Sequence, residues 1–253
     1  MRLRAFTPAI LIAATTFLPA CFMGDFALKE RASLVETRAL NADGTFHLKN
    51  INGRVEVATW SEPKVRIEAE KAATSDQALK LVEITIEGQG SRVDVITHQR
   101  RHGFFGPPSK VDYRVTVPEG ARVEVETVNG SVELERLRGA IRASTVNGSM
   151  HIDDAHGAVE ATTVNGSIHA TYATPAGDSR NRFSTTNGSV TVSVPKDCSG
   201  EFEAQTVNGG ISTDFPFEVS GKWGPKQLRG KLGDGKGSFE ITTVNGSVRI
   251  NSI

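Results

Sequence analysis

The chain has 253 residues, of which 38% are hydrophobic and 6% aromatic, and its 29 basic and 29 acidic residues cancel at neutral pH. This composition excludes a protein with several membrane-spanning helices, because each span needs about 20 consecutive apolar residues. A thick globular core is disfavoured because large side chains are few. Without a net charge there is no long-range field to attract nucleic acid, so nucleic-acid binding is not predicted.

The first 20 residues have the features of an export signal. Arg2 and Arg4 precede an apolar run from Ala9 to Leu18, and the run ends in Leu18-Pro19-Ala20-Cys21. A basic start, a short apolar stretch and a small residue before a cleavage site are typical of a secretory signal rather than a membrane span. The Leu-x-Ala-Cys ending resembles the bacterial lipobox, although proline is unusual there. We therefore predict a lipoprotein-type signal peptide over 1–20.

Cleavage before Cys21 would make this residue the lipidated first residue, followed by a linker over 21–30. Several acyl chains anchor a protein stably, since each buried methylene contributes about 0.8 kcal/mol. Phe22, not Asp, follows the cysteine, which by resemblance to Gram-negative lipoproteins favours the outer membrane. We expect an exported, membrane-anchored protein of the outer membrane, periplasm or cell surface, with Cys198 as a free thiol. The alternative is a plain secretory signal with a chance cysteine.

The first half of the folded domain, residues 31–118, is irregular. Its apolar patterning predicts four strands, and a short helix over Thr74–Lys80 with Thr74 or Ser75 as its cap. The predicted strands are Lys64–Lys71, Leu81–Glu87, Arg92–Thr97 and Val111–Val117. We expect this half to be degenerate coils or a small sheet that caps the rest, because an open stack of coils exposes unpaired strand edges.

A basic and aromatic stretch, Arg100–Pro108, lies between two of these strands. It predicts an exposed hairpin loop whose tip could contact lipid headgroups, anionic glycans or a partner protein. The candidate binding residues are Arg100, Arg101, His102, Phe104 and Phe105. The alternative is that both phenylalanines fold back on the protein.

A repeated motif, Thr-Val-Asn-Gly-Ser or a near copy, dominates residues 119–253. From Asn129 onward its asparagines are spaced by 18, 18, 22, 21 and 37 residues, and the last gap holds an insertion over 214–237. A more distant copy contains Asn52. The Asn-Gly pairs of all copies are Asn52 and Gly53, Asn129 and Gly130, Asn147 and Gly148, Asn165 and Gly166, Asn187 and Gly188, Asn208 and Gly209, and Asn245 and Gly246.

Apolar residues at fixed distances from each asparagine alternate with polar ones, which predicts strands with one face inward. Four inward apolar side chains contribute at most about 12 kcal/mol, whereas ordering the backbone of one repeat costs about 18 to 36 kcal/mol. One repeat therefore cannot fold alone. We predict an all-β, single-stack β-solenoid with coils of about 18–22 residues, capped by the irregular N-terminal β region. The insertion is expected to be a hairpin or loop over the far end or flank.

An antiparallel meander is the alternative fold, because Asn-Gly between alternating strands is also a strong hairpin signal. The aligned threonine and asparagine columns favour stacking, since like side chains can then bond along the stack. We expect Asn-Gly to supply the positive φ angles of a tight corner. If the coils stack in chain order, one outward column alternates in charge. This column is Glu124, Arg142, Glu160, Arg182, Glu203 and, after the insertion, Glu240.

Three other patterns have a functional and a structural interpretation. The Asn-Gly-Ser strings match the glycosylation sequon, but corner formation explains them without a glycan. His151 and His169 occupy equivalent positions in adjacent repeats and could share a metal, yet no zinc signature is present, so no metal or cofactor is predicted. Asp153 and Asp154 could act as carboxylates of a glycan-cleaving enzyme, but adjacent strand residues point to opposite faces. A turn before Gly157 suits them better.

Several of these features together resemble a bacterial domain family of unknown function named as putative adhesins. The resemblance covers about residues 30–253 and rests on the lipoprotein-like start, the tandem motif and three further segments. These segments are Asn52–Val57, Val111–Pro118 and Leu228–Gly233. It implies a β-solenoid-like fold and provides no catalytic residues.

We therefore expect a non-enzymatic envelope lipoprotein whose domain over 31–253 presents a rigid repeat surface to an envelope glycan or protein. One alternative is an accessory or regulatory envelope protein that binds a membrane-protein partner. A second is a glycan-active β-helix enzyme.

Overall fold

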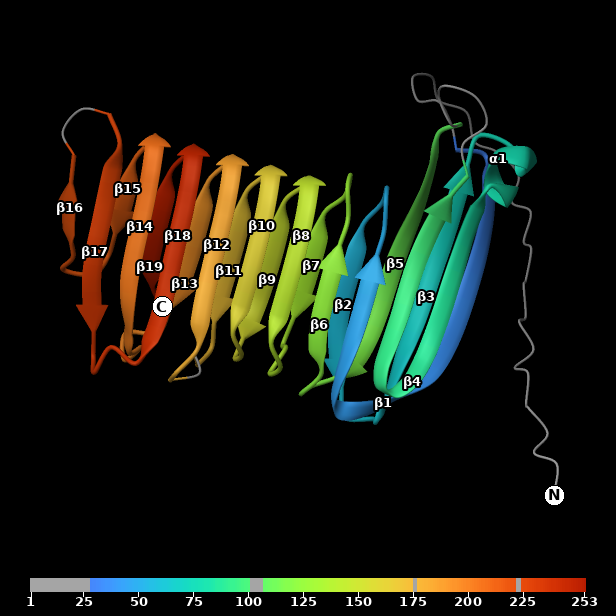
Figure 1. Ribbon diagram of the computed structural model, residues 1–253, viewed down its shortest axis with the longest axis horizontal. Coiled ribbons are helices and arrows are strands. Elements are labelled where there is room, and N and C mark those ends of the chain that lie inside the picture. Colours follow the sequence, from blue (N-terminus) through green and yellow to red (C-terminus); the bar gives the residue numbers. More distant parts are fainter. Residues whose placement is uncertain (1–27, 101–106, 175–176, 222–223) are drawn as a thin grey trace.

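The computed structural model describes residues 28–100, 107–174, 177–221 and 224–253, so the predicted signal peptide and Cys21 lie outside the described residues. The described chain is almost entirely β-structure (Figure 1). Its strands are β1 (Glu30–Lys49), β2 (Val55–Trp60), β3 (Lys64–Ala73), β4 (Val82–Gln99), β5 (Ser109–Pro118), β6 (Arg122–Glu126), β7 (Val132–Glu135), β8 (Ile141–Asn147), β9 (Met150–Ala155), β10 (Val159–Asn165), β11 (Ile168–Tyr172), β12 (Arg180–Asn187), β13 (Val190–Val194), β14 (Gly200–Asn208), β15 (Ile211–Thr213), β16 (Glu218–Ser220), β17 (Lys226–Leu232), β18 (Gly237–Asn245) and β19 (Val248–Ser252).

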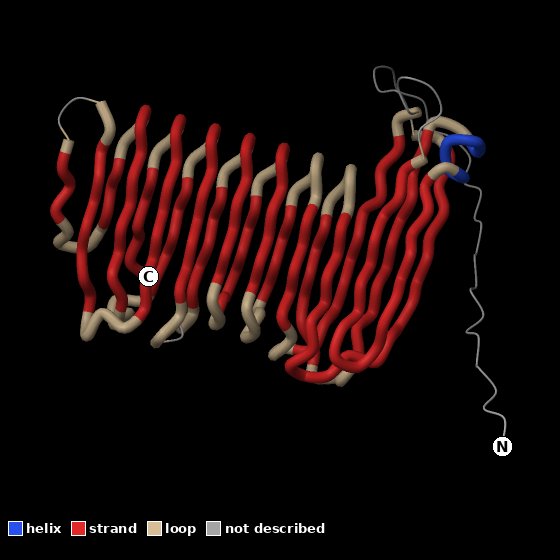
Figure 2. The backbone as a smooth tube through the Cα atoms, in the orientation of Figure 1, coloured by secondary structure: helices blue, strands red, loops and turns tan. Residues whose placement is uncertain are grey.

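The strands form two facing sheets, and each regular coil contributes one strand to each sheet. Sheet A contains, in spatial order, the first part of β1, then β3, β5, β2, β7, β9, β11, β13, β19 and β15. Sheet B contains β4, the second part of β1, β6, β8, β10, β12, β18, β14, β17 and β16. The coil strands pair in parallel, and the corner loops align in two rows along the stack (Figure 2). This parallel stacking confirms the predicted solenoid and excludes the meander.

The last coil of the chain is not the last coil of the stack. Strand β18 lies between β12 and β14, and β19 lies between β13 and β15. The insertion explains this order. Strand β17 pairs antiparallel with the outer edge of β14, and the chain then returns to the opposite edge of β14. The expectation that the charged column follows chain order was therefore wrong at its far end. Glu240, not Glu203, is the neighbour of Arg182, and Glu203 pairs with Arg229 at 3.0 Å.

The interior is filled by the inward columns of both sheets. Valine, isoleucine, leucine and alanine side chains are buried in every coil, which matches the few aromatic residues of the chain. Larger rings gather near the far end, where Phe202 stacks on Phe239 with ring centroids 4.4 Å apart. Tyr172 meets the same Phe239 edge-on at 5.5 Å. The rings fill the space beneath the insertion.

The corner glycines have a different role from the one expected. Positive φ angles occur at Gly53, with φ of 119°, but at none of the corner glycines in the regular coils. Instead, a Cβ atom on Gly148 would lie 1.9 Å from the carbonyl oxygen of Gly130, and the corner glycines of the other regular coils face the same clash. Glycine is needed here because successive corners stack too closely for any side chain.

Longer strands close the N-terminal end of the stack. Helix α1 (Asp76–Lys80) lies over this end, and Ser75 caps it by accepting a hydrogen bond from the Ala78 N–H, as the sequence predicts. In β4 the chain reverses at Gly88 and Gly90, which have positive φ angles. The two predicted strands over 81–97 are therefore the two arms of one hairpin. At the end away from the turn, the Arg100 N–H donates a hydrogen bond to the Leu81 carbonyl. Among the described residues, no helix is long and apolar enough to cross a membrane.

Candidate functional site

A continuous ladder of asparagine side chains runs along one corner of the stack. In each coil the Nδ2 atom donates to the Oδ1 atom of the preceding asparagine in space, over 2.8 to 2.9 Å. The members of this asparagine ladder, in spatial order, are Asn52, Asn129, Asn147, Asn165, Asn187, Asn245 and Asn208. Hydrogen bonds on both sides hold each inner side chain, which favours the structural over the glycosylation interpretation of the motif.

Buried threonines support the same corner from inside. The Oγ1 atom of Thr163 donates to the Gly148 carbonyl over 3.1 Å, and the equivalent threonines of four other coils make the same bond. Thr127 is the exception, because its buried Oγ1 has no hydrogen-bond partner among the described residues. The corner is therefore fixed by bonds between coils on both its outer and its inner side.

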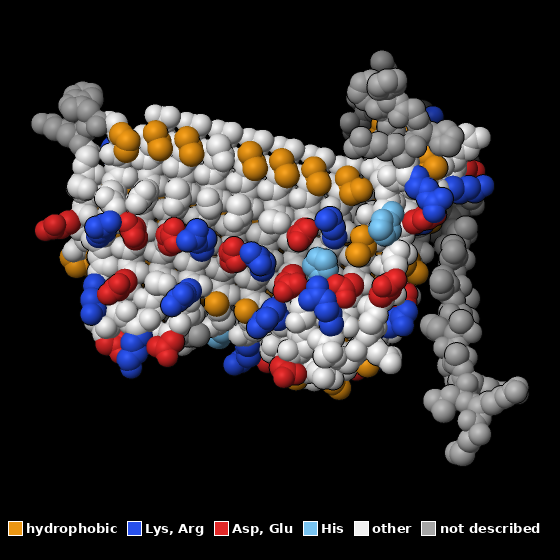
Figure 3. Space-filling view, in the orientation of Figure 1, with side chains coloured by type: hydrophobic (Ala, Val, Ile, Leu, Met, Phe, Trp, Pro, Cys, Tyr) orange, Lys and Arg blue, Asp and Glu red, His pale blue; other side chains and the backbone are white. Residues whose placement is uncertain are grey.

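A line of exposed valines lies beside the asparagine ladder. Each valine directly precedes a ladder asparagine, and each is 38 to 44% exposed. This valine row consists of Val128, Val146, Val164, Val244 and Val207. Apolar side chains line this edge of the molecule in Figure 3, above a band of basic and acidic side chains on sheet B. The outer surface thus presents regular rows of one chemical type.

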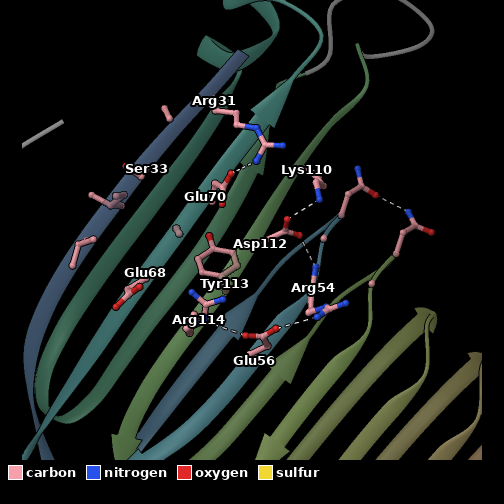
Figure 4. A pocket seen from close by; sticks show the side chains of 18 residues that line it. Arg31, Ser33, Arg54, Glu56, Glu68, Glu70, Lys110, Asp112, Tyr113 and Arg114 are labelled. Atoms are coloured by element: carbon pink, nitrogen blue, oxygen red, sulfur yellow. Dashed lines mark hydrogen bonds and ion pairs between the residues drawn. The ribbon is translucent and has the colours of Figure 1, made fainter. Parts of the chain in front are cut away.

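A groove of about 1040 Å³ lies on the outer face of sheet A at the N-terminal end. It spans β1, β3, β5 and β2 and reaches the ladder at Asn52 and Asn129 (Figure 4). We call it the sheet A groove. Its charged side chains are Arg31, Arg54, Lys110 and Arg114, with Glu56, Glu68, Glu70 and Asp112. Because its charged side chains are equally divided between the two signs, the groove favours neither anionic nor cationic ligands.

The charges of the groove are arranged in pairs. Glu56 is shared, because one carboxylate oxygen lies 3.2 Å from Arg54 and the other 3.2 Å from Arg114. Lys110 lies 2.7 Å from Asp112, and Arg31 pairs with Glu70. The hydrogen bond to Glu56, together with nearby Glu133, raises the pKa of Arg54. These pairs orient the side chains toward one another while leaving the guanidinium groups accessible.

Local backbone geometry brings these residues together. Gly53 allows β5 to approach β2, since a Cβ atom there would lie 2.2 Å from the Val111 carbonyl oxygen. The backbone N–H of Arg54 then donates to Asp112 over 2.9 Å. Beneath them Tyr113 points into the protein, where its hydroxyl bonds Thr97 over 2.6 Å and burial raises its pKa to about 12. The tyrosine supports the groove floor, and its buried hydroxyl does not act as a proton donor toward a ligand.

The predicted binding loop falls largely outside the described residues. Of its five candidates, Arg101, His102, Phe104 and Phe105 lie in the segment that is not described. Arg100 forms an ion pair with Glu83 at 3.1 Å. The loop therefore stays a prediction.

The two predicted histidines do lie side by side on sheet A. The rings of His151 and His169 stack with centroids 5.2 Å apart. Partial burial, with His151 and Arg249 nearby, lowers the pKa of His169. In the described part of the chain no group of three metal-ligating residues comes together.

The two aspartates are not placed together as an acid and base pair. Asp153 and Asp154 lie within strand β9, just before its last residue Ala155, instead of in the following turn, and Asp154 has a φ of 56°. Asp153 accepts from Thr171 and Asp154 lies 3.6 Å from His156. Each carboxylate thus has a neighbour of its own.

The sequence did not identify the sheet A groove. Its segments in β2, β3 and β5 were predicted to be β-structure, but no strand was predicted for residues 31–35, which the first part of β1 contributes. The two stretches Asn52–Val57 and Val111–Pro118 supply four of its eight charged residues. Their charged residues carry no motif that would show which strands become neighbours. Only the pairing of β2 with β5 brings them together.

The architecture defines a parallel β-solenoid of two sheets with asparagine corners. The chain belongs to the Toastrack DUF4097 family, whose model matches residues 23–251, and this confirms the family resemblance seen in the sequence.

Similar proteins with solved structures include two from bacteria. A putative cell adhesion protein from Clostridium sporogenes ATCC 15579 is 12% identical, with a TM-score of 0.51 over 87% of this chain and 100% of that chain. A putative adhesin from Bacteroides fragilis NCTC 9343 is 8% identical, with a TM-score of 0.33 over 86% of this chain and 96% of that chain. The first likeness supports the fold. No curated protein matches the chain.

Proposed function

We propose that this protein is a non-enzymatic lipoprotein of the cell envelope that binds an envelope glycan or protein on its rigid outer surface. The observation that carries the proposal is the sheet A groove, a large hollow whose charged side chains form ion pairs with one another. A ligand would meet donors and acceptors that these pairs already orient. Such preorganisation lowers the entropic cost of binding.

The asparagine ladder supports this proposal because it holds one wall of the groove. Asn129 donates to Asn52 over 2.8 Å, and Asn52 in turn donates to the Ser109 carbonyl. The amides also keep one N–H each free for a ligand, since a carboxamide has two donors and the ladder uses one. The wall is thus rigid and still able to form hydrogen bonds.

The position of the groove supports an envelope ligand. Glu30, where β1 begins, lies nine positions after Cys21, and an extended chain spans about 3.4 Å per residue. A lipid anchor at Cys21 would therefore hold Glu30, next to the first groove residue Arg31, within about 30 Å of Cys21. The description of the similar Clostridium protein as an adhesion protein agrees with a binding role.

The direct test is capture of ligands by the full chain, purified in mild detergent and immobilised. A panel of envelope polysaccharides and a cross-linked pulldown from intact cells serve as probes. The groove variant is the double substitution Arg54→Ala and Arg114→Ala, and the control is Arg142→Ala with Arg182→Ala on sheet B. We expect loss of capture by the groove variant alone.

Three results would contradict the proposal. They are equal capture by both variants, no capture by the parent chain, and cleavage of a polysaccharide by the purified protein. Binding to whole cell surfaces would support adhesion, whereas one stoichiometric membrane partner would support the regulatory alternative.

Mass spectrometry of the mature N-terminus tests the anchor separately. We expect a first residue Cys21 that carries acyl chains. An unmodified Cys21, or cleavage at another position, would rule out lipid anchoring.

A further inference from the structure

The seven corners carry the same reactive dipeptide, and the fold protects them unequally. In an Asn-Gly pair the backbone nitrogen of glycine can attack Cγ of the asparagine side chain, forming a C–N bond and expelling ammonia. The nitrogen gives up its proton in this step, and a five-membered succinimide results. Water then opens the ring to aspartate or isoaspartate. The reaction needs no reagent besides water.

Six corners block this attack with a backbone hydrogen bond. The glycine N–H donates to the asparagine carbonyl of the neighbouring coil over 2.9 to 3.1 Å, so the nitrogen is neither free to lose its proton nor free to move. The glycines protected in this way are Gly53, Gly130, Gly148, Gly166, Gly188 and Gly246. Their asparagines are also fixed, because each amide both donates and accepts a side-chain hydrogen bond.

The corner at Asn208 and Gly209 lacks both protections. It belongs to the last coil of the regular stack in space, so no further corner lies beyond it. Within the described ranges the N–H of Gly209 has no acceptor, and Oδ1 of Asn208 accepts no hydrogen bond. Gly209 is exposed, whereas the six other corner glycines are half-buried. Only the bond from Asn208 Nδ2 to Asn245 Oδ1, at 2.9 Å, restrains this side chain.

We propose that Asn208 is a site of spontaneous deamidation through a succinimide formed with Gly209. The product carboxylate cannot donate to Asn245, so the terminal rung of the ladder is lost and one negative charge is added. Isoaspartate also inserts a methylene group into the backbone between β14 and β15. The change loosens the terminal coil while β18 and β19 stay paired to β12 and β13.

The test follows all seven asparagines in one sample. The full chain is held folded at mildly alkaline pH in water labelled with oxygen-18, and peptide mass spectrometry measures the label incorporated at each site. We expect Asn208 to deamidate about tenfold faster than the asparagine of any other corner. This factor corresponds to the stabilisation that one or two hydrogen bonds provide at the protected corners. The matched control is the same chain in concentrated guanidinium, where the seven rates should become similar.

Two outcomes would overturn the proposal. One is a folded chain in which Asn208 reacts no faster than the inner corners. The other is an excess rate at Asn208 that persists in guanidinium, because its cause would then be local sequence and not its place in the stack. As a second variant, Asn208→Gln should abolish labelling at this site while leaving the circular dichroism spectrum unchanged.

Discussion

Nη2 of Arg182 lies 2.6 Å from Oε2 of Glu240, although the two residues are 58 positions apart in the chain. The contact exists because the final coil, β18 and β19, enters the stack between two coils made earlier. The C-terminal coil therefore has neighbours on both sides instead of forming an exposed end.

The coupling of Arg182 with Glu240 can be measured by charge exchange. Arg182→Glu would place four acidic side chains in successive coils, at positions 160, 182, 240 and 203. We expect it to lower the free energy of unfolding by about 0.5 to 1 kcal/mol, since exposed pairs are weak. Adding Glu240→Arg should restore most of this loss. Adding Glu203→Arg should not, although Glu203 would be the partner if coils stacked in chain order. Urea denaturation of the two double variants decides between these arrangements.

The sequence predicts the coils well but not their order. Inward columns, corners and the Ser75 cap follow from local patterns that each repeat carries by itself. Nearly identical coils can stack on one another in any order, so nothing in the repeat specifies that β18 inserts before β14. The sheet A groove is unpredictable for a related reason, because it depends on the antiparallel pairing of β1 with β3 and of β3 with β5.

Close stacking of glycines predicts a large effect of a single methyl group. Gly148→Ala should destabilise the protein by about 3 kcal/mol, at the upper end of the range for overpacking, because its Cβ would lie 1.9 Å from a backbone oxygen. Gly177→Ala is the matched control, since nothing lies within 4 Å of a Cβ there. Gly148→Asn separates the two explanations of the corner. A left-handed corner would tolerate asparagine, whereas a close-packed corner would not. Thermal unfolding of the three variants provides the measurement.

Replacing two of the buried threonines by valine should change the stability of the protein in opposite directions. Thr163→Val removes a hydrogen bond to the Gly148 carbonyl and should cost about 1 kcal/mol. Thr127→Val removes a buried hydroxyl that has no partner, so stability should rise by about 1 kcal/mol. Both substitutions conserve shape and lie two residues before a ladder asparagine. Equal effects at the two positions in chemical denaturation would show that the corner bonds do not contribute to stability.

The buried thiol Cys198 predicts how stability responds to alkali. Burial, with a smaller effect of Asp197, raises the pKa of Cys198 from 9.0 to about 11 in the folded protein. The unfolded chain therefore loses this proton first, and the contribution of Cys198 to stability is complete below pH 9 and declines between pH 9 and 11. In the Cys198→Ala variant, the urea midpoint should depend less on pH over this interval than in the parent chain.

The folded parent should also react with iodoacetamide at pH 8 far more slowly than the unfolded chain, because the thiolate is the nucleophile. Rapid alkylation of the folded protein would show that the thiol is accessible and that its pKa is not raised.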